Sequence, residues 1–198
     1  MGVTTLVLVV GVAGVGKSTI GNEVAKRTKS VLIDKDVLTE NFTEVLLSSL
    51  SPNRDRNDRQ SGFYLENVRP LEYEATLNVA EENLKLGNNV VIVAPFISEL
   101  RKDNWLKEEM TRRNLKCNVK VIYVNASLDT QQKRLKKRNL SRDEWKLNNW
   151  SKYADNSDVN ITWPLNQDEL LIVNNDFRYG SPEYKNLMNE LISWINLK

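Results

Sequence analysis

A glycine-rich run at residues 11–18, Gly-Val-Ala-Gly-Val-Gly-Lys-Ser, follows a stretch of leucine and β-branched residues at Thr4–Val10. An apolar stretch bounded by glycine predicts a strand that is buried on both faces. A helix is predicted to follow at Lys17–Lys29. The run matches G-x-x-x-x-G-K-[ST] in full, and in this setting its backbone N–H groups and the helix N-terminus would face an anion. The sequence therefore predicts a phosphate-binding loop.

Each part of this loop has an expected role. Lys17 would pair with the β- and γ-phosphates of ATP or GTP, and the Ser18 hydroxyl would ligate Mg²⁺. A glycine-rich turn without a ligand is the alternative, but such a turn needs neither the lysine nor the hydroxyl. The loop residues predicted to bind the nucleotide are Gly11, Val12, Ala13, Gly14, Val15, Gly16, Lys17, Ser18 and Thr19.

Apolar strands alternate with helical periodicity along the chain. The predicted strands are Thr4–Val10, Val31–Ile33, Val90–Val93, Val119–Val124 and Leu170–Val173. The predicted helical segments are Lys17–Lys29, Val37–Leu50, Gly62–Leu86 with an interruption near Pro70, Glu99–Asn114, one from Leu128, and Pro182–Leu197. Parallel strands need crossover connections, so the pattern predicts a three-layer α/β fold with helices on both faces of a parallel sheet. We expect one domain over residues 1–198.

Composition narrows the chemistry. The 198 residues include no histidine and one cysteine, Cys117, so a zinc site and an internal disulfide are not expected. A carboxylate would have to serve as any general base. No apolar stretch approaches the roughly 18 residues of a membrane helix. The net charge of +2 is too mild to indicate nucleic acid or membrane as a partner. We expect a cytoplasmic protein.

Two aspartates follow the second predicted strand. Asp34 and Asp36 would lie at the edge of the sheet where open α/β folds bind ligands. One carboxylate could take a proton from an acceptor hydroxyl while the other supports a metal ion. The alternative role is to cap the helix predicted from Val37.

Arg134, Arg138 and Arg142 recur every four residues in a basic segment. If one helix continued through all three, they would share a face and could close over a triphosphate as a lid at about residues 134–150. A solvated helix face is the alternative. The lid turn is expected at Asn139–Glu144, with Ser141 capping the next helix and Glu144 at the capping-box position.

These features together resemble the P-loop small-molecule kinases, and within them the AAA-type kinase-like ATPases related to chloramphenicol phosphotransferase, gluconate and shikimate kinases, polynucleotide 5′-kinase and zeta toxins. The resemblance covers residues 3–175 and rests on the loop at 11–18, Asp34-Lys35-Asp36, Ala94-Pro95-Phe96 and the arginine pattern. It implies strand order 2-3-1-4-5, Mg²⁺-ATP as donor, and Asp36 as base. Relatives often carry aspartate where Val93 stands, so metal support would come from Asp34 or Asp36.

The resulting hypothesis is transfer of a phosphoryl group from Mg²⁺-ATP to a hydroxyl of a small molecule. Lys17, Asp36, Arg138 and Arg142 would be catalytic, Arg134 and Arg138 would also contact the nucleotide, and Ser18 and Asp34 would support the metal. A polar or anionic acceptor could contact residues between the second and third strands, namely Arg54, Arg56, Arg59, Tyr64 and Arg69.

Two other functions remain open at the level of sequence. A nucleotide or polynucleotide 5′-kinase would be favoured by base stacking on Phe63 or Tyr64, and an ATP-binding regulatory switch with weak ATPase activity by the Val93 substitution. A GTPase is disfavoured because Asn174-Asn175-Asp176 lacks the lysine of a guanine-reading motif. We expect a monomer or a homodimer, and the irregular stretch at 155–166 with Trp163 could add to a pocket.

Overall fold

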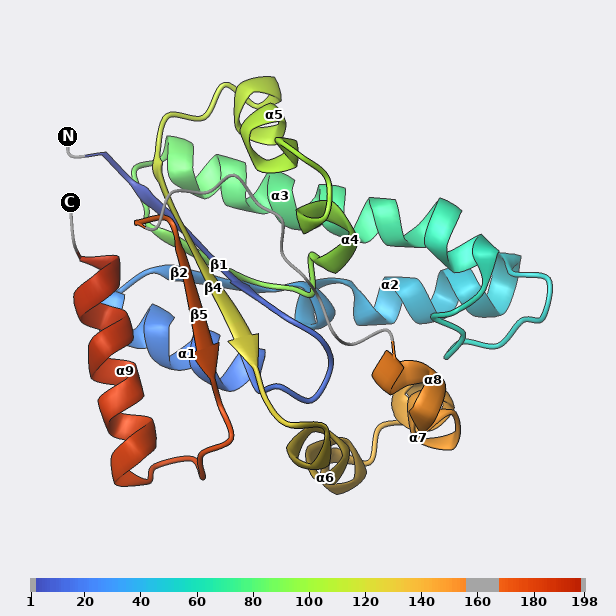
Figure 1. Cartoon of the computed structure of the whole chain (residues 1–198). Helices are drawn as coiled ribbons and strands as arrows, with labels where there is room; N and C mark the ends of the chain where they lie inside the picture. The colour runs from blue at the N-terminus through green and yellow to red at the C-terminus, as the bar shows by residue number, and fades with distance from the viewer. Residues whose placement is uncertain (1–2, 156–167, 197–198) are drawn as a thin grey trace.

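A computed structural model of the chain describes residues 3–155 and 168–196. Its centre is a parallel sheet with the strand order β2-β3-β1-β4-β5 (Figure 1). The strands are β1 (Thr5–Val10), β2 (Val31–Asp34), β3 (Val90–Val93), β4 (Asn118–Asn125) and β5 (Leu170–Asn174). The predicted strands and their order are confirmed. Trp163 and nearly all of the predicted irregular stretch lie outside the described residues.

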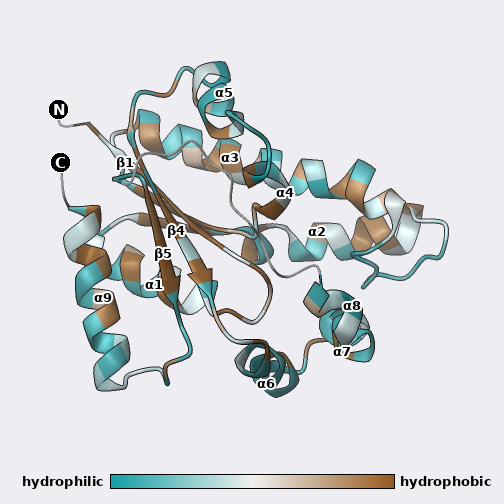
Figure 2. Cartoon of the chain, in the orientation of Figure 1, coloured by the Kyte–Doolittle hydropathy of each residue, from teal (hydrophilic) through white to brown (hydrophobic). Residues whose placement is uncertain are grey.

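The central strands form the core. Leu8 and Val9 of β1, Ile92 of β3 and Ile122 of β4 are fully buried. Figure 2 shows these strands as the most hydrophobic part of the chain, whereas many helical residues on the outside are hydrophilic. This distribution explains the continuous apolar runs in the sequence, because a parallel sheet covered on both faces buries every side chain of its inner strands.

Helices cover both faces of the sheet. The helical segments are α1 (Lys17–Thr28), α2 (Lys35–Leu50), a π-helical turn η1 (Tyr64–Val68), α3 (Arg69–Lys85), α4 (Ile97–Leu100), α5 (Trp105–Arg112), α6 (Leu128–Arg138), a 3₁₀ turn η2 (Ser141–Asp143), α7 (Glu144–Asn148), α8 (Trp150–Asp155) and α9 (Pro182–Ile195). In Figure 1, α1 and α9 lie together on one side of the sheet, and α3, α4 and α5 lie on the other. The three-layer α/β prediction is confirmed.

Three helical predictions need comment. The interruption near Pro70 is real, since η1 ends at Val68 and Pro70 lies in the first turn of α3, where its missing N–H costs nothing. The single helix predicted at Glu99–Asn114 is wrong: α4 and α5 are separate, and Asn104 between them has a left-handed backbone with φ of 63°. The helix predicted from Val37 begins two residues earlier, at Lys35.

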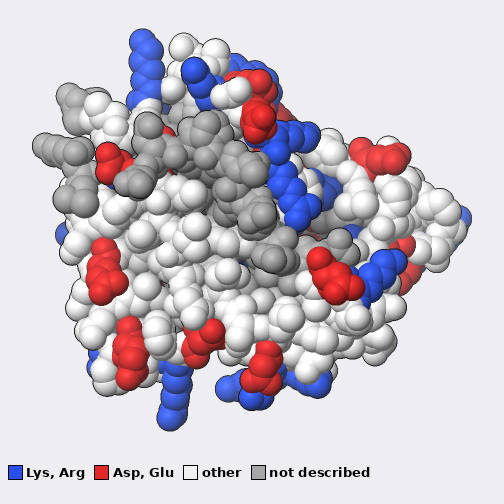
Figure 3. Space-filling view, in the orientation of Figure 1, with Lys and Arg blue, Asp and Glu red and all other residues white. Residues whose placement is uncertain are grey.

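The surface shows no strong segregation of charge in the view of Figure 3, where acidic and basic residues alternate around the rim of the visible face. This agrees with the small net charge of +2. None of the helices within residues 3–155 and 168–196 has the length and apolar character that a membrane crossing needs.

Candidate active site

The glycine-rich loop joins β1 to α1, as predicted. Gly11 and Gly16 both have positive φ, at 139° and 96°. A Cβ at Gly11 would collide with the carbonyl oxygen of Val124, and one at Gly16 with the side-chain amide of Asn175. Glycine adopts these backbone angles without strain and has no Cβ that would overlap the neighbouring atoms. The two glycines therefore let the loop pack closely against β4 and the segment after β5.

Lys17 is the first residue of α1, and its ammonium group donates to the carbonyl oxygen of Val12 at 2.8 Å. Burial lowers the pKa of Lys17 to about 8. Among the described residues Lys17 forms no ion pair, so the positive charge near the loop is not neutralised by a carboxylate in contact with it. An anion of the size of a phosphate would relieve this cost of burying a charge.

Ser18 and Asp34 come together at the start of α1. The Ser18 hydroxyl donates to Asp34 Oδ2 at 2.7 Å. Asp34 is the last residue of β2 and is paired in register with Val93 of β3. A hydroxyl and a carboxylate are the oxygen ligands that Mg²⁺ prefers, and Mg²⁺ commonly takes one or two protein ligands with phosphates supplying others. The residues present fit that ion.

Asp34 also caps α2. Its Oδ1 accepts the backbone N–H of Asp36 at 3.0 Å, and that of Val37 at 3.5 Å. The capping alternative is thus confirmed for Asp34 and wrong for Asp36. The cap does not compete with the contact to Ser18, because the two use different oxygens of the carboxylate.

Asp36 points into the same region but has charged partners. Lys35 Nζ lies 3.1 Å from its Oδ1, and a guanidinium nitrogen of Arg142 lies 3.0 Å from its Oδ2. Burial works against ionisation, yet these two cations hold the pKa of Asp36 at about 2. The group is therefore a carboxylate at neutral pH, able to accept a hydrogen bond from a hydroxyl.

The arginine row is not one helix face. Helix α6 ends at Arg138, because Asn139 takes a left-handed conformation with φ of 48° and closes the helix. Arg142 lies beyond that break, in η2, so the shared face predicted for a continuous helix is wrong. The caps predicted for the next segment are also wrong: Ser141 donates instead to Asn57 at 3.0 Å, and α7 has no side-chain cap bond.

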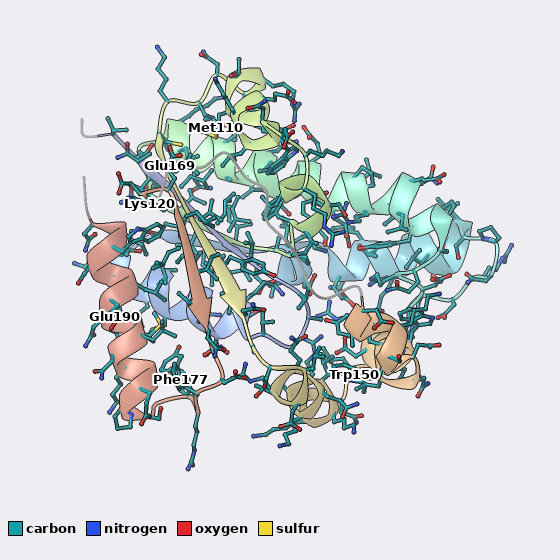
Figure 4. All side chains as sticks on the ribbon, in the orientation of Figure 1. Met110, Lys120, Trp150, Glu169, Phe177 and Glu190 are labelled. Atoms are coloured by element: carbon teal, nitrogen blue, oxygen red, sulfur yellow. The ribbon has the colours of Figure 1, made fainter. Side chains whose placement is uncertain are left out.

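Each arginine has its own partners. Arg134 donates to the backbone carbonyl oxygens of Val15 at 3.0 Å and Asn175 at 2.7 Å, with longer bonds to Gly14 and Phe177. Figure 4 shows Phe177 on the segment between β5 and α9. Arg134 therefore links this segment to the glycine-rich loop.

The other two arginines of the predicted lid hold carboxylates. Arg138 donates to the fully buried Asp143, with one bond of 2.8 Å. Arg142 contacts Asp36 at 3.0 Å and Glu40 at 2.5 Å, so a lid residue reaches the start of α2. The predicted lid segment and the predicted base are therefore in direct contact.

One cavity of about 1170 Å³ gathers most of the predicted residues. It is lined by the loop, the two aspartates and the three arginines, namely Ala13, Gly14, Gly16, Lys17, Ser18, Thr19, Asp34, Asp36, Arg134, Arg138 and Arg142. Three loop residues predicted to bind nucleotide, Gly11, Val12 and Val15, do not line it. Arg59, Tyr64 and Arg69 of the predicted acceptor region line it as well, but Arg54 and Arg56 do not.

A buried polar cluster beside this cavity was missed by sequence reasoning. Glu72 of α3 is 4% exposed, and its carboxylate accepts from Lys35 at 2.9 Å, Thr43 at 2.6 Å and Tyr64 at 2.8 Å. Within residues 3–155 and 168–196, no group of three or more His, Cys, Asp or Glu side chains could hold a metal ion. Glu72 is thus a structural partner for cations and hydroxyls of α2 and η1.

The AAA domain family matches residues 6–158. Shikimate kinase of Coxiella burnetii is 26% identical over 148 residues, which cover 75% of this chain and 71% of the relative.

Several solved structures share the fold. A candidate kinase from Chloroflexus aurantiacus has a TM-score of 0.67 at 18% identity, with 100% of both chains covered. A sugar kinase from Janibacter sp. HTCC2649 has a TM-score of 0.60 at 14% identity over 98% of this chain and 95% of the other. The APS kinase of Mycobacterium tuberculosis, in complex with AMPPNP and APS, has a TM-score of 0.58 at 16% identity over 98% of both. The family match spans more than half of the sequence, so this chain belongs to the AAA domain family.

Proposed function

We propose that this protein is a kinase that transfers the γ-phosphoryl group of Mg²⁺-ATP to a hydroxyl group of a small molecule. The observation that carries the proposal is the shared cavity: Lys17 and the glycine-rich loop line it together with Asp36 and the lid residue Arg142. A phosphate donor and a hydroxyl acceptor can therefore meet in one cavity, with an ionised carboxylate beside them.

The donor would bind on the loop. Backbone N–H groups of the loop and the ammonium of Lys17 would hold the β- and γ-phosphates, while Arg134 keeps the loop in place. Ser18 and Asp34 would hold Mg²⁺, which when bound neutralises charge on the phosphates. The long cavity beside Arg134, Arg178 and Phe177 would take the rest of the nucleotide.

The acceptor would bind on the Asp36 side. Its hydroxyl would donate a hydrogen bond to Asp36, which has lone pairs left beside Lys35 and Arg142. As the hydroxyl oxygen bonds to the γ-phosphorus, the bond between that phosphorus and the β–γ bridging oxygen breaks, ADP leaves, and Asp36 receives the hydroxyl proton. Arg138 and Arg142 would stabilise charge on the group in transfer.

The relatives support this reading. Shikimate kinase of Coxiella burnetii is a small-molecule kinase by name, and the similar sugar kinase and APS kinase structures come from the same class. A single domain, a cytoplasmic location and a monomeric or homodimeric state remain predictions.

The other two functions are less well supported. Stacking of a nucleic-acid base on Tyr64 is disfavoured, because the guanidinium of Arg59 lies over that ring at 5.5 Å and the hydroxyl is bound to Glu72. A switch without acceptor chemistry was suggested by Val93, yet Asp34 supplies a carboxylate next to that position.

Substitution of Asp36 tests the proposal. We expect Asp36→Ala to lower acceptor-dependent ADP release by about 10²-fold or more, while the Kd for Mg²⁺-ATP stays close to that of the native protein. The assay would use a panel of sugars, nucleosides, nucleotides, antibiotics and 5′-hydroxyl oligonucleotides. Asp129→Asn, on the exposed side of α6, serves as a control. An unchanged turnover in Asp36→Ala would remove Asp36 from the mechanism.

A further inference from the structure

The cavity has two parts with different chemistry. We define the donor half by the loop at residues 11–19, α6 and the segment after β5. We define the acceptor half by the start of α2, residue 59, η1 and the start of α3. On the premise of the proposed kinase function, we propose that the acceptor is an uncharged hydroxyl compound with an apolar face, and not an anion.

Arg69 forms an ion pair with a carboxylate of the protein itself. Two of its guanidinium nitrogens donate to the two oxygens of Glu99, at 2.6 Å and 2.8 Å. Its flat face lies 4.5 Å from the centre of the Tyr73 ring. A bidentate pair of this kind occupies the geometry that would otherwise hold a substrate carboxylate or phosphate.

Arg59 is committed in the same way. One nitrogen donates to Glu40 at 3.1 Å, another donates to the carbonyl oxygen of Arg56 at 3.0 Å, and the guanidinium lies over Tyr64. Its side chain is only 11% exposed. An anion would have to compete with an internal carboxylate that is already in place.

Lys35 is paired with carboxylates as well, and so is Arg142, with Asp36 and Glu40. The ammonium of Lys35 lies 2.9 Å from Glu72 and 3.1 Å from Asp36, and its side chain is 6% exposed. Glu72 cannot turn away to water, because it is buried and holds Thr43 and Tyr64 as well. A second anion here would meet the negative charge of Asp36 and of the buried Glu72.

Apolar side chains also line the acceptor half of the cavity. Val37 is 85% exposed and Leu65 is 49% exposed, and both are among its lining residues. Gln60 adds an uncharged polar group. Apolar walls with a few polar groups suit a neutral ligand that presents C–H surface on one side and hydroxyls on the other.

The anion preference of the acceptor half can be measured without turnover. The native protein would be saturated with Mg²⁺-AMPPNP to fill the donor half, then titrated with sodium sulfate and with sodium acetate at constant ionic strength. The ¹⁵N signals of the arginine Nε–H groups report binding. We expect no saturable shift of the Arg59 and Arg69 signals. A saturable shift in the native protein would overturn the inference.

A variant that neutralises one carboxylate provides a positive result to compare with the native protein. Glu99→Gln keeps the side-chain shape but frees Arg69, and we expect it to bind sulfate at least about tenfold more tightly than the native protein. Glu108→Gln, an exposed residue of α5 outside the cavity, changes the net charge equally and should behave like the native protein. If Glu99→Gln unfolds, Glu40→Gln frees Arg59 together with Arg142, and the Nε–H signal of Arg59 then reports whether sulfate binds at that residue. Equal sulfate affinity in the native protein and in the folded variant would count against the inference.

Matched acceptor pairs connect this result to the kinase. Polyols and their acid counterparts, such as glucitol and gluconate, would be compared by acceptor-dependent ADP release. Preference for the neutral member supports the inference, and preference for the acid overturns it. If no acceptor in the panel stimulates ADP release, the proposed kinase function is contradicted. The sulfate titration still decides whether the acceptor half binds anions.

Discussion

The donor and acceptor halves of the cavity both contain buried or half-buried cations, but the partners of those cations differ. Lys17 and Arg134 in the donor half are bound by backbone carbonyl oxygens, whereas Arg138 at the end of α6 is held by Asp143. Lys35 and Arg69 in the acceptor half are bound by carboxylates. A carbonyl satisfies hydrogen bonds without cancelling charge, so the donor half stays attractive to a polyphosphate. A carboxylate offsets the charge, and Lys35 and Arg69 therefore hold α2, α3 and α4 together.

The largest expected effect comes from removing donor-half charge. Lys17→Ala should lower ATP-dependent turnover by about 10²-fold or more, because one preorganised cation at the transferring group is lost. ADP release under saturating acceptor measures this effect. Lys26→Ala, an exposed lysine on the same helix, should leave turnover unchanged. Retained turnover in Lys17→Ala would contradict the difference between the two halves, because the Lys17 charge would then not act on the phosphate.

In the acceptor half, loss of a carboxylate should instead affect folding. Glu72→Gln leaves Lys35 buried with only Asp36 as a charged partner, and breaking a buried ion pair costs about 3 kcal/mol of unfolding free energy. Urea unfolding followed by tryptophan fluorescence checks this value. Glu82→Gln, whose side chain is 74% exposed, should shift the midpoint hardly at all. A small loss in Glu72→Gln would mean that Lys35 is stabilised by other groups.

The smallest effect concerns pH. Because burial lowers the pKa of Lys17 to about 8, the free protein loses this charge as the pH rises through 8, and the affinity for Mg²⁺-ATP should fall by about half at that pH. Calorimetric Kd values across neutral and alkaline pH test this. Lys17→Arg should move the fall to higher pH, since guanidinium stays protonated. Asp36, with a pKa of about 2, should cause no loss of affinity in mildly acidic solution.

Much of the donor half could be predicted from sequence. The loop is a contiguous motif, and its neighbours β1 and α1 are local in the chain, so residue types and spacing suffice to place Lys17 and Ser18. The sheet order was implied by the family resemblance and is confirmed. Asp34 could be placed near the loop because it ends a strand, and strand ends in a parallel sheet share one edge.

The acceptor half could not be predicted in the same way. The pairing of Lys35 with Glu72 joins residues 37 positions apart on two helices, and neither residue carries a local signal of burial. The break of α6 at Asn139 had a local signal, because asparagine tolerates a left-handed backbone at a helix end. The spacing of the arginines alone could not show that the helix ends at Asn139 and that Arg142 therefore leaves the helix that carries Arg134.

Arg134 and Asn175 both donate to the carbonyl oxygen of Val15, across 119 and 160 positions of the chain. These two hydrogen bonds, which we call the braces of the loop, can both be in place only after residue 175 has been synthesised. A nascent chain that has released only β1 and α1 from the ribosome already has the whole glycine-rich motif, but it lacks both braces. We therefore expect nucleotide affinity to arise late in translation, after β5 has joined the sheet. ATP would then stabilise the folded protein and would not assist the first steps of folding.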